Sequence, residues 1–212
     1  MHHLDKVVAV HADELMRVQK RVMALKCLIM GARGIYDQDA SPSQTYCNHA
    51  AYLTIKALDK DYTQFTKGAD CPPWDPNTFP ENPHKSDYEG SNSLKTSNLW
   101  CDVLEYQAND ESCPIKEVTA EEAQKLANMG YVVVVCWKNT KPTKSPHFAT
   151  VAPDTRAYNP KQGPYIANVG VVNDYMNVTS SDSFGKRTPL RYFYNTKQNF
   201  REDYSQIREF EN

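Results

Sequence analysis

The sequence predicts an α+β fold in which N-terminal helices pack on a C-terminal antiparallel β-sheet. Two observations indicate this class. Several stretches within the first 130 residues carry apolar side chains at helical spacing between charged ones, and the rest carries short apolar runs separated by turn-rich spacers. Helices followed by strands are typical of α+β domains. Because 212 residues suffice for one domain with its own core, we expect a single domain over residues 1–212.

The first two helices are separated by a turn. Residues 5–31 place valine, leucine and isoleucine at helical intervals without a proline, so we expect a packing helix here and treat residues 1–33 as an N-terminal helical extension. A turn with aspartate, serine and proline follows, and the second helix is expected over residues 45–58. The proline-rich stretch 68–98 has no periodicity and predicts a long loop insertion, a feature that is usually functional.

Two further helices precede the sheet. Residues 98–108 have helical spacing. The next helix is expected to begin at Thr119, which can form a capping box with Glu122, and to end at Gly130. Four short apolar runs between turn-forming residues then predict strands, at 131–137, 147–152, 164–172 and 187–194.

Charge and hydropathy argue against several classes of partner. The chain has 24 Lys and Arg against 26 Asp and Glu, with a pI near 6.3, so it lacks the basic character of proteins that bind nucleic acid or anionic membrane. No apolar run approaches the roughly 18 to 20 residues that span a bilayer. The N-terminal residues do not show the pattern of a signal peptide. We expect neither nucleic acid nor membrane as a partner, and we expect a monomer.

The six cysteines are scattered without a C-x-x-C pair, which argues against a zinc ribbon, a thioredoxin motif or a dense disulfide scaffold. A disulfide among Cys71, Cys101 and Cys113 is compatible with their positions in or beside irregular sequence, and Cys136 is expected to be a buried thiol in its apolar strand. An alternative function is a catalytically silent binding module in which Cys71, Cys101, Cys113 and His84 hold a structural zinc, although their spacings match no common zinc motif.

Cys47 is the candidate nucleophile. Free cysteine is usually buried, but Thr45 as an N-cap places Cys47 in the first turn of its helix, where unpaired N–H groups and the helix dipole favour the thiolate. A thiolate nucleophile also needs a base. His49 lies about 200° around the helix from Cys47, so its ring points away. His147 opens a strand after a polar loop, where its ring can face a cleft, and we expect it to be the base.

The third member of the site must reach the far ring nitrogen of His147 from a neighbouring strand. Asp154 and Asn159 have suitable side chains, but both fall near the tip of the hairpin, roughly 20 Å from His147 along a straight strand. If the hairpin loop spans 153–162, antiparallel counting brings Asn168 opposite His147, where its amide oxygen can accept the imidazole N–H. Asn168 is therefore the predicted orienting residue.

These residues resemble those of a known family. A helix-opening cysteine in "TYCN", a strand-opening histidine in "PHFATVAP" and the next strand "GPYIANVG" are similar to NlpC-type cell-wall hydrolases of the papain-like cysteine peptidase superfamily, over residues 33–195. The resemblance implies a papain-like fold and a Cys–His pair, matched here by Cys47 and His147, that cleaves amide bonds in peptidoglycan stem peptides. The usual family version has aspartate before its cysteine and serine and glycine after it. This chain has "YCNH" and so looks closer to divergent phage lysins or toxin-like amidases.

An oxyanion site is also implied. The backbone N–H of Cys47 supplies one donor at the helix start, and the family points to a tyrosine eleven residues before the cysteine, here Tyr36. Gln44 is a papain-style alternative, and Tyr46 is a third candidate for oxyanion or substrate binding. The implied chemistry uses no metal and no cofactor. Its partner is a peptidoglycan peptide, so the protein would act on the cell wall after secretion, in the periplasm or by phage delivery.

The sequence therefore predicts a cysteine peptidase or amidase that cleaves stem peptides through a thioester intermediate. Two alternatives stay open. One is a papain-like thiol hydrolase or acyltransferase that acts on another amide or acyl substrate, and the other is the silent binding module.

Overall fold

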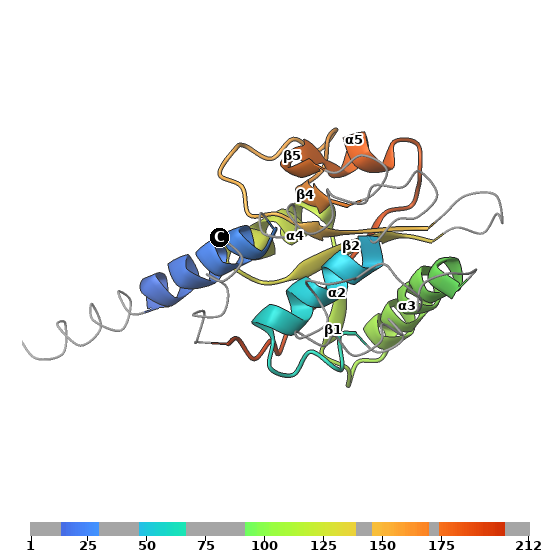
Figure 1. The fold of residues 1–212 in the computed structure, drawn as a ribbon, viewed down its shortest axis with the longest axis horizontal. Helices are drawn as coiled ribbons and strands as arrows, with labels where there is room; N and C mark the ends of the chain where they lie inside the picture. Colours follow the sequence, from blue (N-terminus) through green and yellow to red (C-terminus); the bar gives the residue numbers. More distant parts are fainter. Residues whose placement is uncertain (1–13, 30–46, 67–91, 139–145, 170–173, 202–212) are drawn as a thin grey trace, which may run out of the picture.

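The fold combines helices with an antiparallel sheet, as the order of the sequence patterns predicts (Figure 1). The structure is a computed structural model, and it describes residues 14–29, 47–66, 92–138, 146–169 and 174–201. Within this part of the chain the α+β class is confirmed.

One sheet of six strands forms the centre of the molecule. Every neighbouring pair is antiparallel, and the order across the sheet is β1-β6-β2-β3-β4-β5. In chain order the strands are β1 Ile115–Val118, β2 Val133–Trp137, β3 His147–Val151, β4 Tyr165–Asn168, β5 Asp174–Thr179 and β6 Arg191–Asn195.

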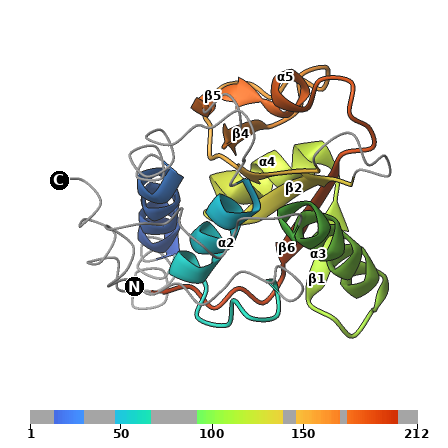
Figure 2. The same cartoon turned by 45° about the vertical axis from the view of Figure 1, so that its right-hand side comes forward.

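The helices lie on both faces of this sheet. A first helix over residues 14–29, coloured blue in Figure 1, precedes α2 Cys47–Leu58, α3 Asn92–Asn109, α4 Ala120–Asn128 and α5 Ser180–Phe184. Figures 1 and 2 both show α2 and α4 on opposite sides of the sheet.

This arrangement explains why β2 is apolar along its whole length. Val134 and Cys136 belong to a core cluster with residues of α2, α3 and the first helix. Val133 and Val135 belong to a second cluster with alanines of α4. Successive side chains of a strand point to opposite faces. Because helices cover both faces of β2, every side chain in its central run is buried.

The start and end of α4 follow the predicted capping chemistry. The Thr119 side chain accepts the backbone N–H of Glu122, and the Glu122 carboxylate accepts the backbone N–H of Thr119. These bonds satisfy N–H groups that have no partner within the helix. Gly130, at φ +83°, follows the last turn in the left-handed region that glycine adopts without steric cost. The predicted capping box and glycine stop are confirmed.

One expected segment boundary is wrong. α3 begins at Asn92, so residues 92–97, expected to belong to the 68–98 loop, are helical. Residues 67–91 lie outside the described part of the chain. The expected packing of the helix over residues 14–29 is confirmed, because Leu25 and Ile29 are fully buried in the first core cluster. The sequence patterns also did not predict β1, β5 or α5.

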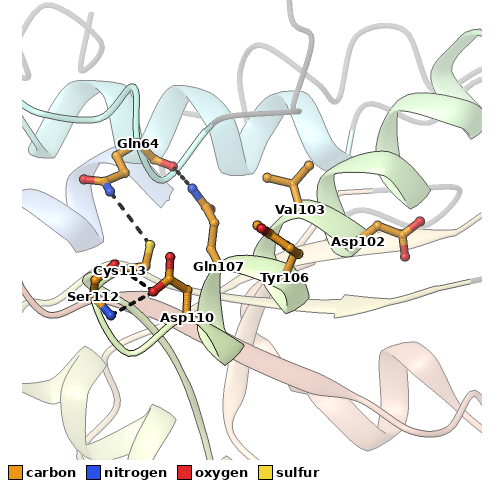
Figure 3. A pocket seen from close by; sticks show the side chains of 8 residues that line it. All are labelled: Gln64, Asp102, Val103, Tyr106, Gln107, Asp110, Ser112 and Cys113. Carbon is orange, nitrogen blue, oxygen red and sulfur yellow. Dashed lines mark hydrogen bonds between the residues drawn. The ribbon is translucent and has the colours of Figure 1, made fainter.

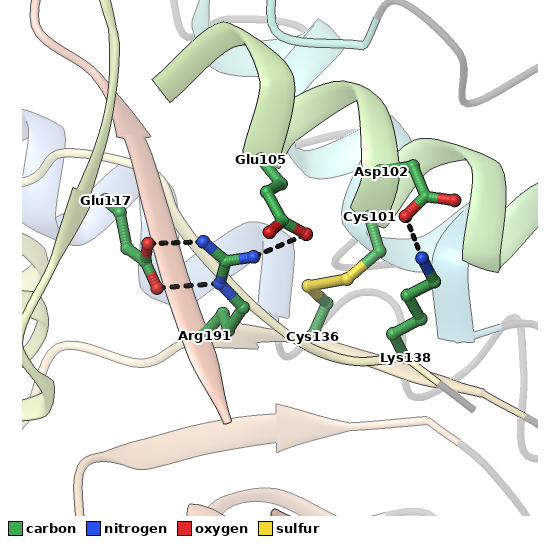
Figure 4. The surroundings of a disulfide bond; sticks show 7 residues. All are labelled: Cys101, Asp102, Glu105, Glu117, Cys136, Lys138 and Arg191. Atoms are coloured by element: carbon green, nitrogen blue, oxygen red, sulfur yellow. Dashed lines mark hydrogen bonds and ion pairs between the residues drawn. A yellow bond between two sulfur atoms is a disulfide. The ribbon is translucent and has the colours of Figure 1, made fainter. Parts of the chain in front are cut away.

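A disulfide joins Cys101 of α3 to Cys136 of β2 (Figure 4). The expected pairing among Cys71, Cys101 and Cys113 is therefore wrong for Cys101, and Cys136 is not a free thiol. Cys113 is a free cysteine, and Cys71 lies outside the described residues. The expectation failed because Cys101 and Cys136 are 35 residues apart in sequence and meet only when α3 packs on the sheet.

Charged side chains surround this disulfide in Figure 4. Arg191 of β6 pairs with Glu105 of α3 at 2.6 Å and with Glu117 of β1 at 2.6 Å. Lys138 pairs with Asp102 of α3. Covalent and ionic contacts therefore hold α3 against this side of the sheet. Among the helices that the structure describes, none is long and apolar enough to cross a membrane.

Candidate active site

Cys47 is the first residue of α2, and α2 packs against β3. The Cys47 side chain is only 2% exposed. Its sulfur is hydrogen-bonded to the His147 side chain and to the backbone at Phe148 and Asn48. The expected nucleophile and base are therefore in contact, although 100 residues of sequence separate them.

The electrostatics of this pair favour charge on both members. Burial raises the pKa of the Cys47 thiol, but the positive charge of His147 and the hydrogen bonds to the sulfur outweigh burial, so the pKa lies below its ordinary value. Burial likewise lowers the pKa of His147. The Cys47 charge and the hydrogen bonds to Cys47 and Asn168 outweigh both burial and the nearby Arg187, so this pKa is raised. Opposite shifts in these directions favour a thiolate–imidazolium pair.

Asn168 contacts the other side of the imidazole. The distance from His147 Nε2 to Asn168 Oδ1 is 2.7 Å, so Nε2–H donates to the amide oxygen and Nδ1 is left for the thiol. The ring therefore has one nitrogen for each partner. This bond fixes the tautomer and the orientation of the imidazole, which is what the third member of a nucleophile–base site does.

The sheet register that places Asn168 differs from the expected one by two residues. We expected Ala152 to pair near Gly163, but the backbone N–H of Ala152 donates to Tyr165 at 2.8 Å. Continuing the observed register sets Asn168 opposite Ala149. A shift of two residues keeps a side chain on the same face of the sheet. Asn168 therefore reaches His147 diagonally rather than from directly opposite.

The two rival candidates are engaged elsewhere. The carboxylate of Asp154 pairs with Arg156, which keeps the pKa of this carboxyl below its ordinary value. Asn159 lies in the turn after β3, where its Oδ1 accepts the backbone N–H of Lys161 at 3.0 Å. Neither contacts His147 among the hydrogen bonds of the described residues.

Ser183 and Phe184 of α5 complete the surroundings of the imidazole, and sequence reasoning missed both. Ser183 Oγ donates to Asn168 Oδ1 at 2.7 Å and lies 3.5 Å from His147 Nε2. The Phe184 ring centre lies 4.7 Å from that of His147. The only signal in the sequence was Thr179 before "SSDS", which caps α5 through the backbone N–H of Asp182.

The site forms where the two core clusters meet. Cys47 belongs to the cluster on the α2 face of the sheet, whereas the Phe184 ring beside His147 belongs to the cluster on the α4 face. The pair therefore joins the two layers at the first residue of β3. Strand periodicity alone cannot reveal such a contact, because it assigns each side chain to one face.

Several expected site residues lie outside the described part of the chain. These are the oxyanion and substrate-binding candidates Tyr36, Gln44 and Tyr46, and also the N-cap Thr45. The backbone of Cys47 is described, and its N–H lies at the start of α2, where donors have no partner within the helix. This N–H is the donor that the sequence led us to expect for an oxyanion.

A cavity of about 410 Å³ lies elsewhere in the molecule, and neither Cys47, His147 nor Asn168 lines it (Figure 3). It lies along α3 beside Cys113, whose sulfur accepts a hydrogen bond from Gln64 Nε2 at 3.8 Å. Gln107 also lines it, and its Oε1 is buried without a hydrogen-bond partner. Among the described residues that line this cavity there is no histidine that could act as a base for Cys113. Because Cys47 has a histidine beside it, the candidate active site is at Cys47 rather than in the cavity beside Cys113.

The alternative zinc site does not fit the structure. Cys101 is bonded to Cys136 and cannot supply a thiolate ligand. Cys71 and His84 lie outside the described residues. Within the described ranges, no cluster of three or more His, Cys, Asp or Glu side chains is arranged to hold a metal ion.

Comparison with known proteins does not identify a family for this chain. The sequence matches no protein-family model, and no curated protein matches it at a significant level. The case for a function therefore rests on the geometry of Cys47, His147 and Asn168.

Proposed function

We propose that this protein is a cysteine-dependent amide hydrolase with a papain-like fold, and that it cleaves peptide bonds in the stem peptides of peptidoglycan. One observation carries the proposal: a buried cysteine at a helix start, a strand-opening histidine and an asparagine on the next strand form one hydrogen-bonded series. The order helix, strand, next strand is the one that the family resemblance implies.

The first half of the reaction forms a thioester. The Cys47 thiolate attacks the amide carbonyl carbon, a C–S bond forms, and the backbone N–H of Cys47 stabilises the oxyanion. The C–N bond then breaks, and the His147 imidazolium gives its proton to the departing amine. Asn168 holds the ring in place during this transfer.

The second half returns the enzyme to its starting state. Neutral His147 takes a proton from water, and the resulting hydroxide attacks the thioester carbonyl carbon. The C–S bond breaks, the carboxylic acid product leaves, and Cys47 is again a thiolate beside an imidazolium. No redox step occurs, and the net reaction consumes one water per amide.

The choice of peptidoglycan rests on the motifs "TYCN" and "PHFATVAP" and is supported by the disulfide. Disulfides persist mainly in oxidising surroundings outside the cytosol. The Cys101–Cys136 bond suits a protein that works on a cell wall.

Digestion of purified peptidoglycan, with mass spectrometry of the released fragments, tests the proposal. We expect the wild-type protein to release fragments with a new amine and a new carboxylate at one stem amide. Cys47→Ala should release none, whereas the matched control Cys113→Ala, which removes a free thiol outside the site, should behave as the wild type.

Two results would count against the proposal. Release of the same fragments by Cys47→Ala would exclude Cys47 as the nucleophile. If the wild type releases no fragments but hydrolyses another amide or an acyl ester in a Cys47-dependent way, the proposed mechanism stands and peptidoglycan is not the substrate.

A further inference from the structure

A basic pocket adjoins the imidazole of His147. Its volume is about 350 Å³, and it is lined by Trp137 at the end of β2 and by residues 183–188, which include the end of α5 and the turn that follows. Lys186 and Arg187 give this segment two positive charges. The proposed reaction assigns no role to either of them.

The pocket shares its walls with the candidate active site. Ser183 lines the pocket and also donates to Asn168. Phe184 lines it and contacts the His147 ring. Trp137 pairs directly with His147 across β2 and β3. A group bound in the pocket therefore lies beside the imidazole.

The two cations are available to a ligand. No carboxylate among the described residues forms an ion pair with Lys186 or Arg187, whereas Arg156 and Arg191 are both paired. The Arg187 guanidinium lies 5.5 Å from the centre of the Trp137 ring, which holds it at the pocket wall. Its charge reaches the active site, because it acts to lower the pKa of His147.

The geometry also indicates which half of the substrate meets this pocket. His147 Nδ1 is left for the thiol, and Nε2 faces Asn168 and Ser183 of the pocket wall. The carbonyl carbon of the substrate bonds to Cys47, while the departing amine must lie next to His147 to receive its proton. The amine receives this proton from Nδ1, so the departing amine and the pocket lie beside the same imidazole, the amine at the edge that faces the thiol and the pocket at the edge that carries Nε2.

We propose that Lys186 and Arg187 bind a carboxylate carried by the amine half of the substrate, close to the amide that is cleaved. This inference rests on the proposed amide hydrolysis and narrows its substrate class. The preferred leaving group is an amino acid or short peptide with a free carboxylate near its departing amine. A guanidinium suits this task because its planar donors match both oxygens of a carboxylate.

The test compares two synthetic stem peptides with the amide that the digest identifies. They differ in one group on the residue after this amide, which is a carboxylate in one peptide and a carboxamide in the other. We expect the wild type to show a kcat/KM about 10-fold or more higher for the carboxylate, the effect of one charge-assisted contact. Arg187→Gln and Lys186→Gln should bring the ratio towards one, and Arg187→Lys should retain part of it.

Lys197→Gln is the matched control, because Lys197 is an exposed lysine after β6 that takes no part in the pocket. It should keep both rates and their ratio at the wild-type values. A wild-type ratio in Arg187→Gln would overturn the carboxylate pocket and leave the Cys47-dependent hydrolysis standing.

A second measurement tests the pocket without a peptide substrate. It still tests the carboxylate-binding role of Lys186 and Arg187 if the wild type cleaves neither peptide and the proposed function fails. Iodoacetate and iodoacetamide both transfer a CH₂ group to the Cys47 thiolate with loss of iodide, but only iodoacetate carries a carboxylate. The ratio of their alkylation rates at Cys47 should fall several-fold in Arg187→Gln and Lys186→Gln and stay constant in Lys197→Gln. An unchanged ratio in the first two variants would overturn the pocket.

Discussion

At the scale of single residues, the behaviour of Cys47 follows from its neighbours. Burial to 2% exposure acts to raise the pKa of a thiol, yet the pKa of Cys47 is lowered because the His147 charge and three hydrogen bonds act on the sulfur. Low exposure is thus compatible with a thiolate when a cation and donors are buried beside it.

Asn168 should contribute to turnover by orienting His147. Asn168→Ala should lower kcat by about 10- to 100-fold, because a misplaced base loses alignment. His147→Ala should lower it by about 1,000-fold or more, because the proton transfer itself is lost. Initial rates on the identified peptide measure both effects, with circular dichroism as the check on folding. Asn159→Ala is the matched control, and a fully active Asn168→Ala beside an inactive Asn159→Ala would overturn the assignment.

The pH dependence of kcat/KM should be bell-shaped, with both limbs set by the Cys47–His147 pair. Activity should rise with pH as Cys47 loses its proton, and this limb is moved to lower pH by the lowered pKa of the thiol. Activity should fall at higher pH as His147 loses its proton, above the ordinary imidazole value of 6.5 because this pKa is raised. The Asn168 bond helps to raise it, so Asn168→Ala should move the alkaline limb to lower pH. An alkaline limb that does not move in this variant would contradict the role of that bond.

At the scale of elements, the disulfide between α3 and β2 should stabilise the fold without taking part in catalysis. Cross-links of this kind stabilise proteins by about 2 to 4 kcal/mol, because they restrict the unfolded chain. The double variant Cys101→Ala/Cys136→Ala should lose about this much free energy of unfolding, measured in urea, and should retain Cys47-dependent activity. Reduction of the wild type should give a similar loss of stability. If reduction leaves the urea midpoint unchanged, the bond does not hold α3 on the sheet.

The elements also show what could be predicted from the sequence. Capping residues identified α4 because the signal is local, within four residues from Thr119 to Glu122. The predicted register between β3 and β4 was wrong by two residues, because local sequence does not determine at which residue a hairpin turns. An even error leaves Asn168 on the same face of the sheet as in the expected register. Ser183 was missed because α5 approaches His147 only in the folded sheet.

At the scale of the whole molecule, the helix over residues 14–29 is part of the core. The helix was recognisable from its periodicity, but its packing depends on contacts with distant residues. The Arg21 guanidinium lies 4.2 Å from the centre of the Phe200 ring. A Cβ on Gly130 would lie 2.4 Å from Arg21 Cβ, so the helix packs closely against the end of α4. The sequence therefore predicted a packing helix, but it could not identify the distant residues against which the helix packs.

Leu25→Ala should therefore destabilise the whole protein. Leu25 is fully buried, and replacing a buried leucine with alanine costs about 2 to 5 kcal/mol. Leu15→Ala on the same helix is the matched control, because Leu15 is 59% exposed and should change stability by roughly 0.5 kcal/mol or less. Urea unfolding followed by tryptophan fluorescence compares the two variants. Equal stability of both variants would show that the helix folds apart from the core.

The most direct test of the thiolate at Cys47 is the order in which the cysteines react with iodoacetamide. Three of the described cysteines lie outside the disulfide, and of these Cys27 is more exposed than Cys47 or Cys113. Exposure alone predicts that Cys27 reacts first, whereas thiolate character predicts Cys47. After a short pulse near pH 6.5, peptide mapping by mass spectrometry should find Cys47 labelled ahead of the other cysteines, with activity lost in proportion and the labelling slowed in His147→Ala. Labelling of Cys27 or Cys113 before Cys47, at a rate that His147→Ala does not change, would contradict the account.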